Sequence, residues 1–154
     1  MAVKLQGRFD VKAAPEEVYA FLTDPRKVSP HMPDVEEVNI EDADHFTVKA
    51  RVGIPHLKGT MVMKLTITDR QPPVSTTVVG KGSGLGSVVD MVTGFKLEAS
   101  AEGGTIVNWQ GEMTIAGKIA ALGAQGLLDR MARKNVETFI DGIRKGLDNS
   151  QLPT

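Results

Sequence analysis

The order of hydrophobic and polar residues divides the chain into a long region of two-residue period and a final region of helical period. Between Val35 and Gly117, apolar and polar residues alternate almost throughout, which is typical of strands with one buried face. From about residue 118 to residue 147, apolar residues recur every three or four positions, with charged residues between them. The pattern predicts about six strands and then one long amphipathic helix over about 118–147, roughly 40 Å or more in length.

The beginning of the chain predicts one more strand and two short helices. Residues 3–12 alternate cleanly between apolar and polar side chains. A helix is expected over about 13–22, because Pro15 suits the first helical turn and the two glutamates that follow suit the helix dipole. The Asp24-Pro25 pair ends this helix, and a second short helix or turn is expected over 26–28.

This order of elements predicts an α+β fold within a single domain over residues 1–154. A curved antiparallel sheet of about seven strands would wrap around the long C-terminal helix, with the two short helices after the first strand. The apolar face of such a sheet needs a cover, and only one long helix is available. A strongly curved sheet around one helix often fails to fill its own concavity, so we expect an apolar internal cavity between them.

The inward positions of the sheet and helix supply the expected lining of this cavity. Several are methionines, whose flexible side chains adapt to irregular shapes. The expected lining residues are Met63, Leu65, Val89, Met91, Phe95, Trp109, Met113, Leu122, Gly123, Leu127 and Met131. Trp109 either packs in the core or stacks on a flat ligand such as a quinone ring. Glycines and alanines gather around Gly123, and we expect the mouth of the cavity at this end of the helix.

The totals exclude several classes of function. The 18 basic and 19 acidic residues give a net charge of −1, which does not favour nucleic-acid binding. The chain has no cysteine, so it has neither disulfides nor thiolate chemistry. No run of about 18 apolar residues could span a membrane. The N-terminus has no apolar signal segment. A cytoplasmic protein is expected.

The sequence offers no assembled catalytic set. His31, His45 and His56 lack metal-ligand spacing, and we expect no metal and no other cofactor. Hydroxyls at Ser87, Thr93 and Thr105 are expected on the inner face. Hydroxyls alone are poor general bases, and we expect these to bond nearby backbone or water.

A string of glycines from residue 80 to residue 86 resembles a phosphate-binding loop in composition. Strands flank it on both sides, however, and no helix follows whose N-terminus could hold an anion. The string therefore predicts a β-hairpin, which could also act as a gate over the mouth of the cavity.

Several local strings resemble the CoxG family of carbon monoxide dehydrogenase proteins, within the START/SRPBCC helix-grip superfamily. They are residues 9–25, 28–38, 105–109 and 116–120, so the resemblance covers nearly the whole chain. Asp34 stands where the family usually has a glycine. The resemblance implies a helix-grip fold and an accessory protein of molybdenum-containing dehydrogenases. Such proteins are thought to aid maturation or membrane recruitment of the enzyme, or to carry a quinone.

Three functions follow from these observations. We expect a non-catalytic carrier that binds an apolar quinone- or lipid-like molecule in the cavity. Alternatively, the protein docks without ligand on a molybdenum dehydrogenase or its maturation machinery, through the charged helix face or residues 28–34, with possible peripheral membrane contact. The third alternative is a small-molecule cyclase or isomerase of the polyketide-cyclase type, for which no acid–base pair can be named.

Overall fold

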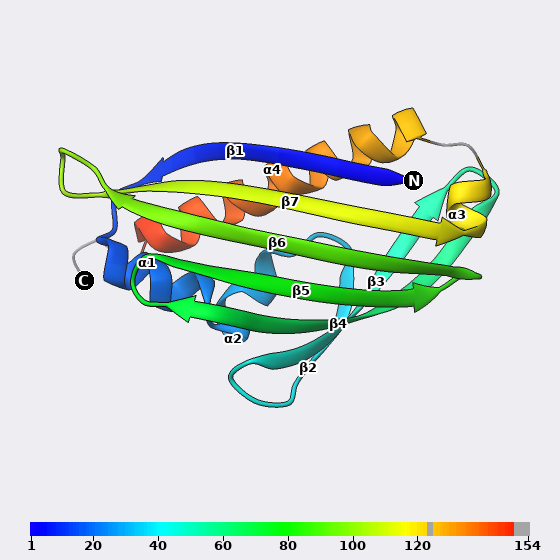
Figure 1. The fold of residues 1–154 in the computed structure, drawn as a ribbon, viewed down its shortest axis with the longest axis horizontal. Coiled ribbons are helices and arrows are strands. Elements are labelled where there is room, and N and C mark those ends of the chain that lie inside the picture. Colours follow the sequence, from blue (N-terminus) through cyan, green and yellow to red (C-terminus); the bar gives the residue numbers. More distant parts are fainter. Residues whose placement is uncertain (123–124, 150–154) are drawn as a thin grey trace.

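The computed structural model, which describes residues 1–122 and 125–149, confirms the expected sheet of seven antiparallel strands (Figure 1). The strands are β1 (Ala2–Val11), β2 (Val35–Ile40), β3 (His45–Ile54), β4 (Leu57–Gln71), β5 (Ser75–Gly84), β6 (Ser87–Ala99) and β7 (Thr105–Gly117). The helices are α1 (Pro15–Leu22), α2 (Pro25–Val28), the 3₁₀ helix η1 (Ser29–His31), α3 (Lys118–Ala121) and α4 (Gln125–Asn149). The two short helices expected after the first strand are therefore present.

The strands lie in the order β1-β7-β6-β5-β4-β3-β2. Strands β2 to β7 follow one another as a meander, and β1 adds to the free side of β7. The glycine string forms the expected hairpin between β5 and β6. Its turn residues Leu85 and Gly86 have φ angles of 54° and 66°, the left-handed conformation of the tight turns that suit a twisted hairpin.

The long helix expected over about 118–147 is formed as two helices, and this boundary prediction is corrected. Helix α3 ends at Ala121, and α4 begins at Gln125. Two contacts hold α3 on the end of the sheet: the backbone N–H of Ile119 donates to Ser87 Oγ at 3.0 Å, and the Ile119 side chain is buried. This anchoring depends on a residue 32 positions away, so helical periodicity could not reveal it. The expected lining residue Gly123 lies outside the described residues.

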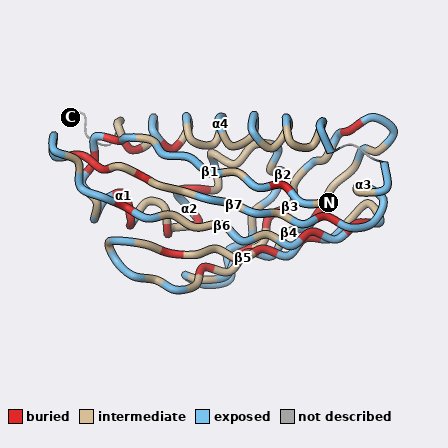
Figure 2. The backbone as a smooth tube through the Cα atoms, turned by 45° about the horizontal axis from the view of Figure 1, so that its top comes forward, coloured by how far each residue is buried: buried red, intermediate tan, exposed pale blue. Residues whose placement is uncertain are grey.

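Helix α4 runs beside β1 on the concave side of the sheet (Figures 1 and 2). At its start, Gln125 Nε2 donates to the backbone oxygen of Ala2 at 3.0 Å. At its end, Asp148 Oδ1 accepts from the backbone N–H of Lys12 at 3.3 Å. The 25 residues of the helix span about 37 Å, close to the length of the ten-residue strand. The helix is thus tied to both ends of the edge strand.

Three apolar clusters form the core. The first joins α1 to the last turns of α4 and contains Val18, Ile143 and Leu147, all at most 2% exposed. The second lies at the opposite end of the sheet, where Ile115 and Ile119 contact the first turns of α4. The third lies on β3 and β4, under β2 and η1. Helix α4 is therefore fixed at its two ends by separate clusters.

A glycine notch on α4 receives the η1 helix. The His31 ring stacks on Phe21 with their centroids 6.0 Å apart, and both rings lie against Gly142 and Gly146. A Cβ added at Gly142 would lie 2.7 Å from His31 Nδ1, and one at Gly146 would lie 3.1 Å from Phe21 Cζ. The two glycines allow the helix to approach these rings closely.

Replacing Gly142 with alanine should therefore destabilise the protein, although alanine favours helices. The added methyl group would overpack the His31 contact, which costs about 1–3 kcal/mol and outweighs the gain of up to about 1 kcal/mol in helix propensity. Thermal unfolding should show a lower midpoint. Gly126→Ala is the matched control, because its Cβ would meet Arg130 at an ordinary 3.5 Å. Equal midpoints for the two variants would contradict the proposed fit at the notch.

Candidate functional site

Strand alternation brings most of the expected lining residues to the concave face, on the side of α4. The register places Leu65, Gly80, Met91 and Met113 in one row across β4, β5, β6 and β7. Phe95 and Trp109 lie opposite each other in a second row. The apolar face thus extends over four neighbouring strands, with α4 above one side of it (Figure 2).

The burial of this face is uneven. Leu65 and Val89 are buried, whereas the other sheet residues of the expected lining stay half-buried; these are Met63, Met91, Phe95, Trp109 and Met113. On α4, Leu127 and Met131 are half-buried and pack on the second cluster. Leu122 is 46% exposed at the end of α3. Solvent therefore reaches apolar side chains in the middle of the concave face, while the clusters close its two ends.

Two inward glycines on β5 make room for the methionines. A Cβ added at Gly80 would lie 2.9 Å from Leu65 Cδ2 and 3.1 Å from Met91 Cε. One at Gly82 would lie 3.5 Å from Met63 Cε. These flexible side chains lie over the glycine backbone and could move aside without disturbing the strands.

Trp109 lies over Gly7 of the neighbouring strand β1. A Cβ added at Gly7 would lie 2.9 Å from Cζ2 of the indole ring. This contact favours the core-packing interpretation for one face of the ring. The ring is nevertheless half-buried, and its role toward a ligand stays a prediction.

The inner hydroxyls bond to backbone atoms, as expected. Thr93 Oγ1 donates to the oxygen of Gln110 at 2.7 Å, and Thr105 Oγ1 donates to the oxygen of Ala13 at 2.7 Å. Ser87 Oγ accepts from the N–H of Ile119. These hydroxyls are therefore committed to holding the strands and helices together.

Asp42 and His45 shift each other's pKa values, and they lie in the β2–β3 turn. His45 Nδ1 lies 2.8 Å from Asp42 Oδ1. This hydrogen bond lowers the pKa of the Asp42 carboxyl and raises the pKa of the His45 imidazole. Both side chains are exposed, and the turn is not part of the concave face. Among residues 1–122 and 125–149, no group of histidines and carboxylates could hold a metal ion.

Two polar groups near the concave face escaped the sequence analysis. The Tyr19 hydroxyl is buried, and no group of the described residues lies within hydrogen-bonding distance of it. Asn135 is half-buried on α4, one turn from Met131 and one turn from Phe139. The sequence signal for Asn135 is a single amide that interrupts the apolar stripe. No sequence signal shows that the Tyr19 hydroxyl lacks a partner.

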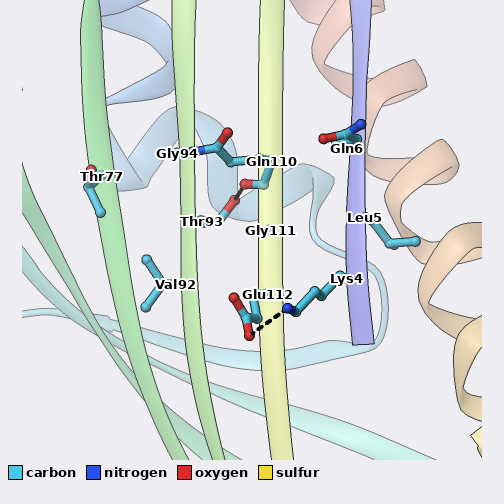
Figure 3. Close-up of a pocket in the computed structure, with 10 residues that line it drawn as sticks. All are labelled: Lys4, Leu5, Gln6, Thr77, Val92, Thr93, Gly94, Gln110, Gly111 and Glu112. Carbon is cyan, nitrogen blue, oxygen red and sulfur yellow. Dashed lines mark hydrogen bonds and ion pairs between the residues drawn. The ribbon is translucent and has the colours of Figure 1, made fainter. Parts of the chain in front are cut away.

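Two shallow depressions lie away from the concave face. One, of about 280 Å³, is on the outer face of β1, β7, β6 and β5, beside Lys4 Nζ and Glu112 Oε1 at 3.7 Å (Figure 3). In this view Leu5 points to the side of α4. The second, of about 290 Å³, lies between η1 and β2. Neither depression is lined by a residue of the expected cavity.

The model of the CoxG family of carbon monoxide dehydrogenase proteins matches residues 7–148 of the chain. A search of curated proteins gives no match. Within the described part of the chain, no helix combines the length and the apolar character needed to cross a membrane.

Solved structures share the fold. A conserved protein of Geobacillus kaustophilus is 24% identical, with a TM-score of 0.85 over 96% of this chain and 97% of that one. A START superfamily protein of Mycobacterium smegmatis is 8% identical, with a TM-score of 0.72 over 96% and 99%. The di-domain ARO/CYC StfQ of the steffimycin biosynthetic pathway is 13% identical, with a TM-score of 0.67 over 97% of this chain and 52% of that one.

Replacing Gly7 with alanine should displace the indole of Trp109, because the new Cβ would lie too close to the ring. Trp109 is the sole tryptophan, so the shift should appear as a changed emission maximum of the intrinsic fluorescence. Gly53→Ala serves as the control, since no atom lies within 4 Å of its added Cβ. An unchanged spectrum in Gly7→Ala would contradict the close packing between β1 and Trp109.

Proposed function

The chain belongs to the CoxG family of carbon monoxide dehydrogenase proteins, and on this premise we propose that it is a cytoplasmic, non-catalytic carrier of an apolar molecule. The ligand is quinone- or lipid-like and binds between α4 and the concave face of the sheet. Residues 1–154 act as one ligand-binding domain. The protein serves a molybdenum-containing dehydrogenase, as the resemblance of its sequence to this family implies.

The observation that carries the proposal is the set of half-buried apolar side chains in the middle of the concave face. Met91 and Met113 lie in the same row of the sheet, and neither is buried. Covering about 200 Å² of apolar surface would contribute about 5 kcal/mol to binding. That contribution corresponds to a dissociation constant of about 0.2 mM before hydrogen bonds are added. A flat or chain-like apolar ligand would gain this energy by entering between the helix and the sheet.

The arrangement of α4 supports entry of a ligand. The helix is fixed at its two ends, by the first and second clusters, and its middle carries the half-buried residues Met131, Asn135 and Phe139. Flexible methionines lie over Gly80 and Gly82 of the strand below. Their side chains can reorient around a ligand at small energetic cost, because methionine has three rotatable bonds and a polarisable sulfur.

The same observations favour a carrier over a cyclase or isomerase. Catalysis of proton transfer needs a group with a suitable pKa within hydrogen-bonding reach of the substrate. The inner hydroxyls of Thr93 and Thr105 instead donate to backbone oxygens. Asp90 is exposed, and its neighbours Val89 and Met91 take the inner positions of β6.

Binding should depend on the inner face of β6 and not on its outer face. Met91→Gln replaces an inward thioether with an amide of similar size, which an apolar ligand would leave unpaired. We expect affinity for a quinone or fatty ligand to fall roughly tenfold, the factor that corresponds to about 1.4 kcal/mol. Native mass spectrometry of protein titrated with a panel of such compounds measures the change. Co-purified compounds are identified after organic extraction.

Val92→Gln is the matched control, since Val92 follows Met91 in the chain, is 52% exposed and lies on the outer face. Its affinity should equal that of the unaltered protein. Absence of saturable binding across the panel would contradict the carrier function. Equal loss in both variants would move the site away from the concave face.

A second candidate function, docking on the dehydrogenase or its maturation machinery, rests on the solvent side of α4. Arg130, Arg133 and Lys134 are exposed there. Such a surface adds electrostatic steering toward an acidic partner, and it is compatible with a carrier that must deliver its ligand. Charge reversal at Arg130 and Arg133 should abolish co-purification of a dehydrogenase from the native host while ligand binding persists. Retained co-purification would exclude this face as the docking surface.

A further inference from the structure

The hydroxyl of Tyr19 is a buried polar group without a partner among the described residues. The whole residue is 6% exposed, and its oxygen is inaccessible to solvent. Its surroundings are apolar: the first cluster contains Val18, Leu97 and Ile143. The nearby hydroxyl of Thr105 donates instead to the backbone oxygen of Ala13. Buried hydroxyls in proteins nearly always form a hydrogen bond, so this one requires an explanation.

A phenylalanine would fill the same space without a buried hydroxyl. An unpaired hydroxyl in an apolar cluster loses its hydrogen bonds to water and gains nothing in return. The tyrosine therefore carries a free-energy cost in the unliganded protein. That cost is removed when an acceptor oxygen reaches the hydroxyl.

The hydroxyl lies next to the candidate binding face. The Tyr19 ring makes an edge-to-face contact with Phe95, with centroids 5.9 Å apart and an interplanar angle of 70°. Phe95 is half-buried and lies opposite Trp109 in the sheet. Phe139 of α4, also half-buried, packs against the same cluster. The Tyr19 cluster thus borders the part of the concave face that solvent reaches.

We infer that Tyr19 is the hydrogen-bond donor for the bound molecule, and this inference rests on the carrier function proposed above. The ligand is a neutral apolar molecule with a carbonyl-type oxygen. That oxygen binds at the α1 end of the concave face, and the apolar remainder lies toward Met91 and Met113. Tyr19 is then the residue that distinguishes an oxygen-bearing ligand from a pure hydrocarbon.

The surroundings determine the chemistry of the acceptor. The buried members of the first cluster are all apolar apart from the tyrosine itself, so a charged ligand group would be left without a counterion there. A carbonyl oxygen accepts the tyrosine proton and brings no donor that would need a second partner. Quinones, ketones and esters meet this requirement.

Two matched probes test the inference: 2-methyl-1,4-naphthoquinone, and 2-methylnaphthalene, which has the same carbon skeleton but no oxygen. The chain has no cysteine, so the quinone cannot form a thioether with the protein. Dissociation constants for both compounds are measured with the unaltered protein and with Tyr19→Phe, from the broadening of the ligand NMR signals. Tyr19→Phe should weaken quinone binding roughly fivefold to tenfold and leave hydrocarbon binding unchanged.

A second measurement observes the hydroxyl directly. Tyr19 is the sole tyrosine, so protein grown with tyrosine labelled at the ring carbon that bears the oxygen gives a single NMR resonance. This resonance should shift when the quinone saturates the protein and should stay in place with the hydrocarbon. Tyr19→Phe should unfold at the same temperature as the unaltered protein or a higher one, because it loses an unpaired hydroxyl.

The outcomes separate this inference from the proposed function. Equal quinone affinity in both proteins, together with an unmoved resonance, would overturn the role of Tyr19 and leave the carrier function standing. Equal affinity of the unaltered protein for both probes would also overturn it. If the unaltered protein binds neither compound, the carrier function fails and the role of Tyr19 fails with it.

Discussion

The structure depends on one shortage: a seven-stranded sheet with an extensive apolar face has a single long helix to cover it. Helix α4 lies beside β1, to which Gln125 and Asp148 bind it at either end. The first and second clusters close the two ends of the concave face against this helix. The strands between receive partial cover, and half-buried methionines and aromatic rings lie there. Incomplete coverage is thus a result of the element count, and it leaves apolar surface for a ligand.

The close contacts around α4 are made by small residues and by a few specific bonds. Gly142 and Gly146 admit the rings of Phe21 and His31, so the helix meets η1 at a fixed position. Ser87 holds the start of α3 through the N–H of Ile119. These contacts fix the frame, while the methionines of the inner face retain several rotamers. A rigid frame around an adaptable lining suits a protein that must bind a bulky apolar molecule and release it.

Local pattern predicted the strands and their inward faces because both depend on the two-residue period of an extended chain. The same reasoning placed Met91 and Phe95 on the inner face. It missed the break after Ala121, since that break follows from a bond to Ser87 far away in the sequence. It also missed Tyr19, because a missing hydrogen-bond partner is a property of the packed state. Whether the expected residues line a ligand site depends on spaces between side chains, which no periodicity encodes.

The pairing of β1 with β7 has a consequence for how the chain acquires its structure. The register joins Ala2 to Thr114, so the first strand finds its neighbour only after most of the chain has been synthesised. Non-local pairings of this kind slow folding, because the entropy of closing a long loop is lost before the contacts form. On the ribosome, the meander from β2 to β6 emerges before both its last neighbour strand and its covering helix. The nascent chain therefore exposes its apolar face for longer than a protein built from local hairpins and helices, which makes it a natural client of chaperones during synthesis.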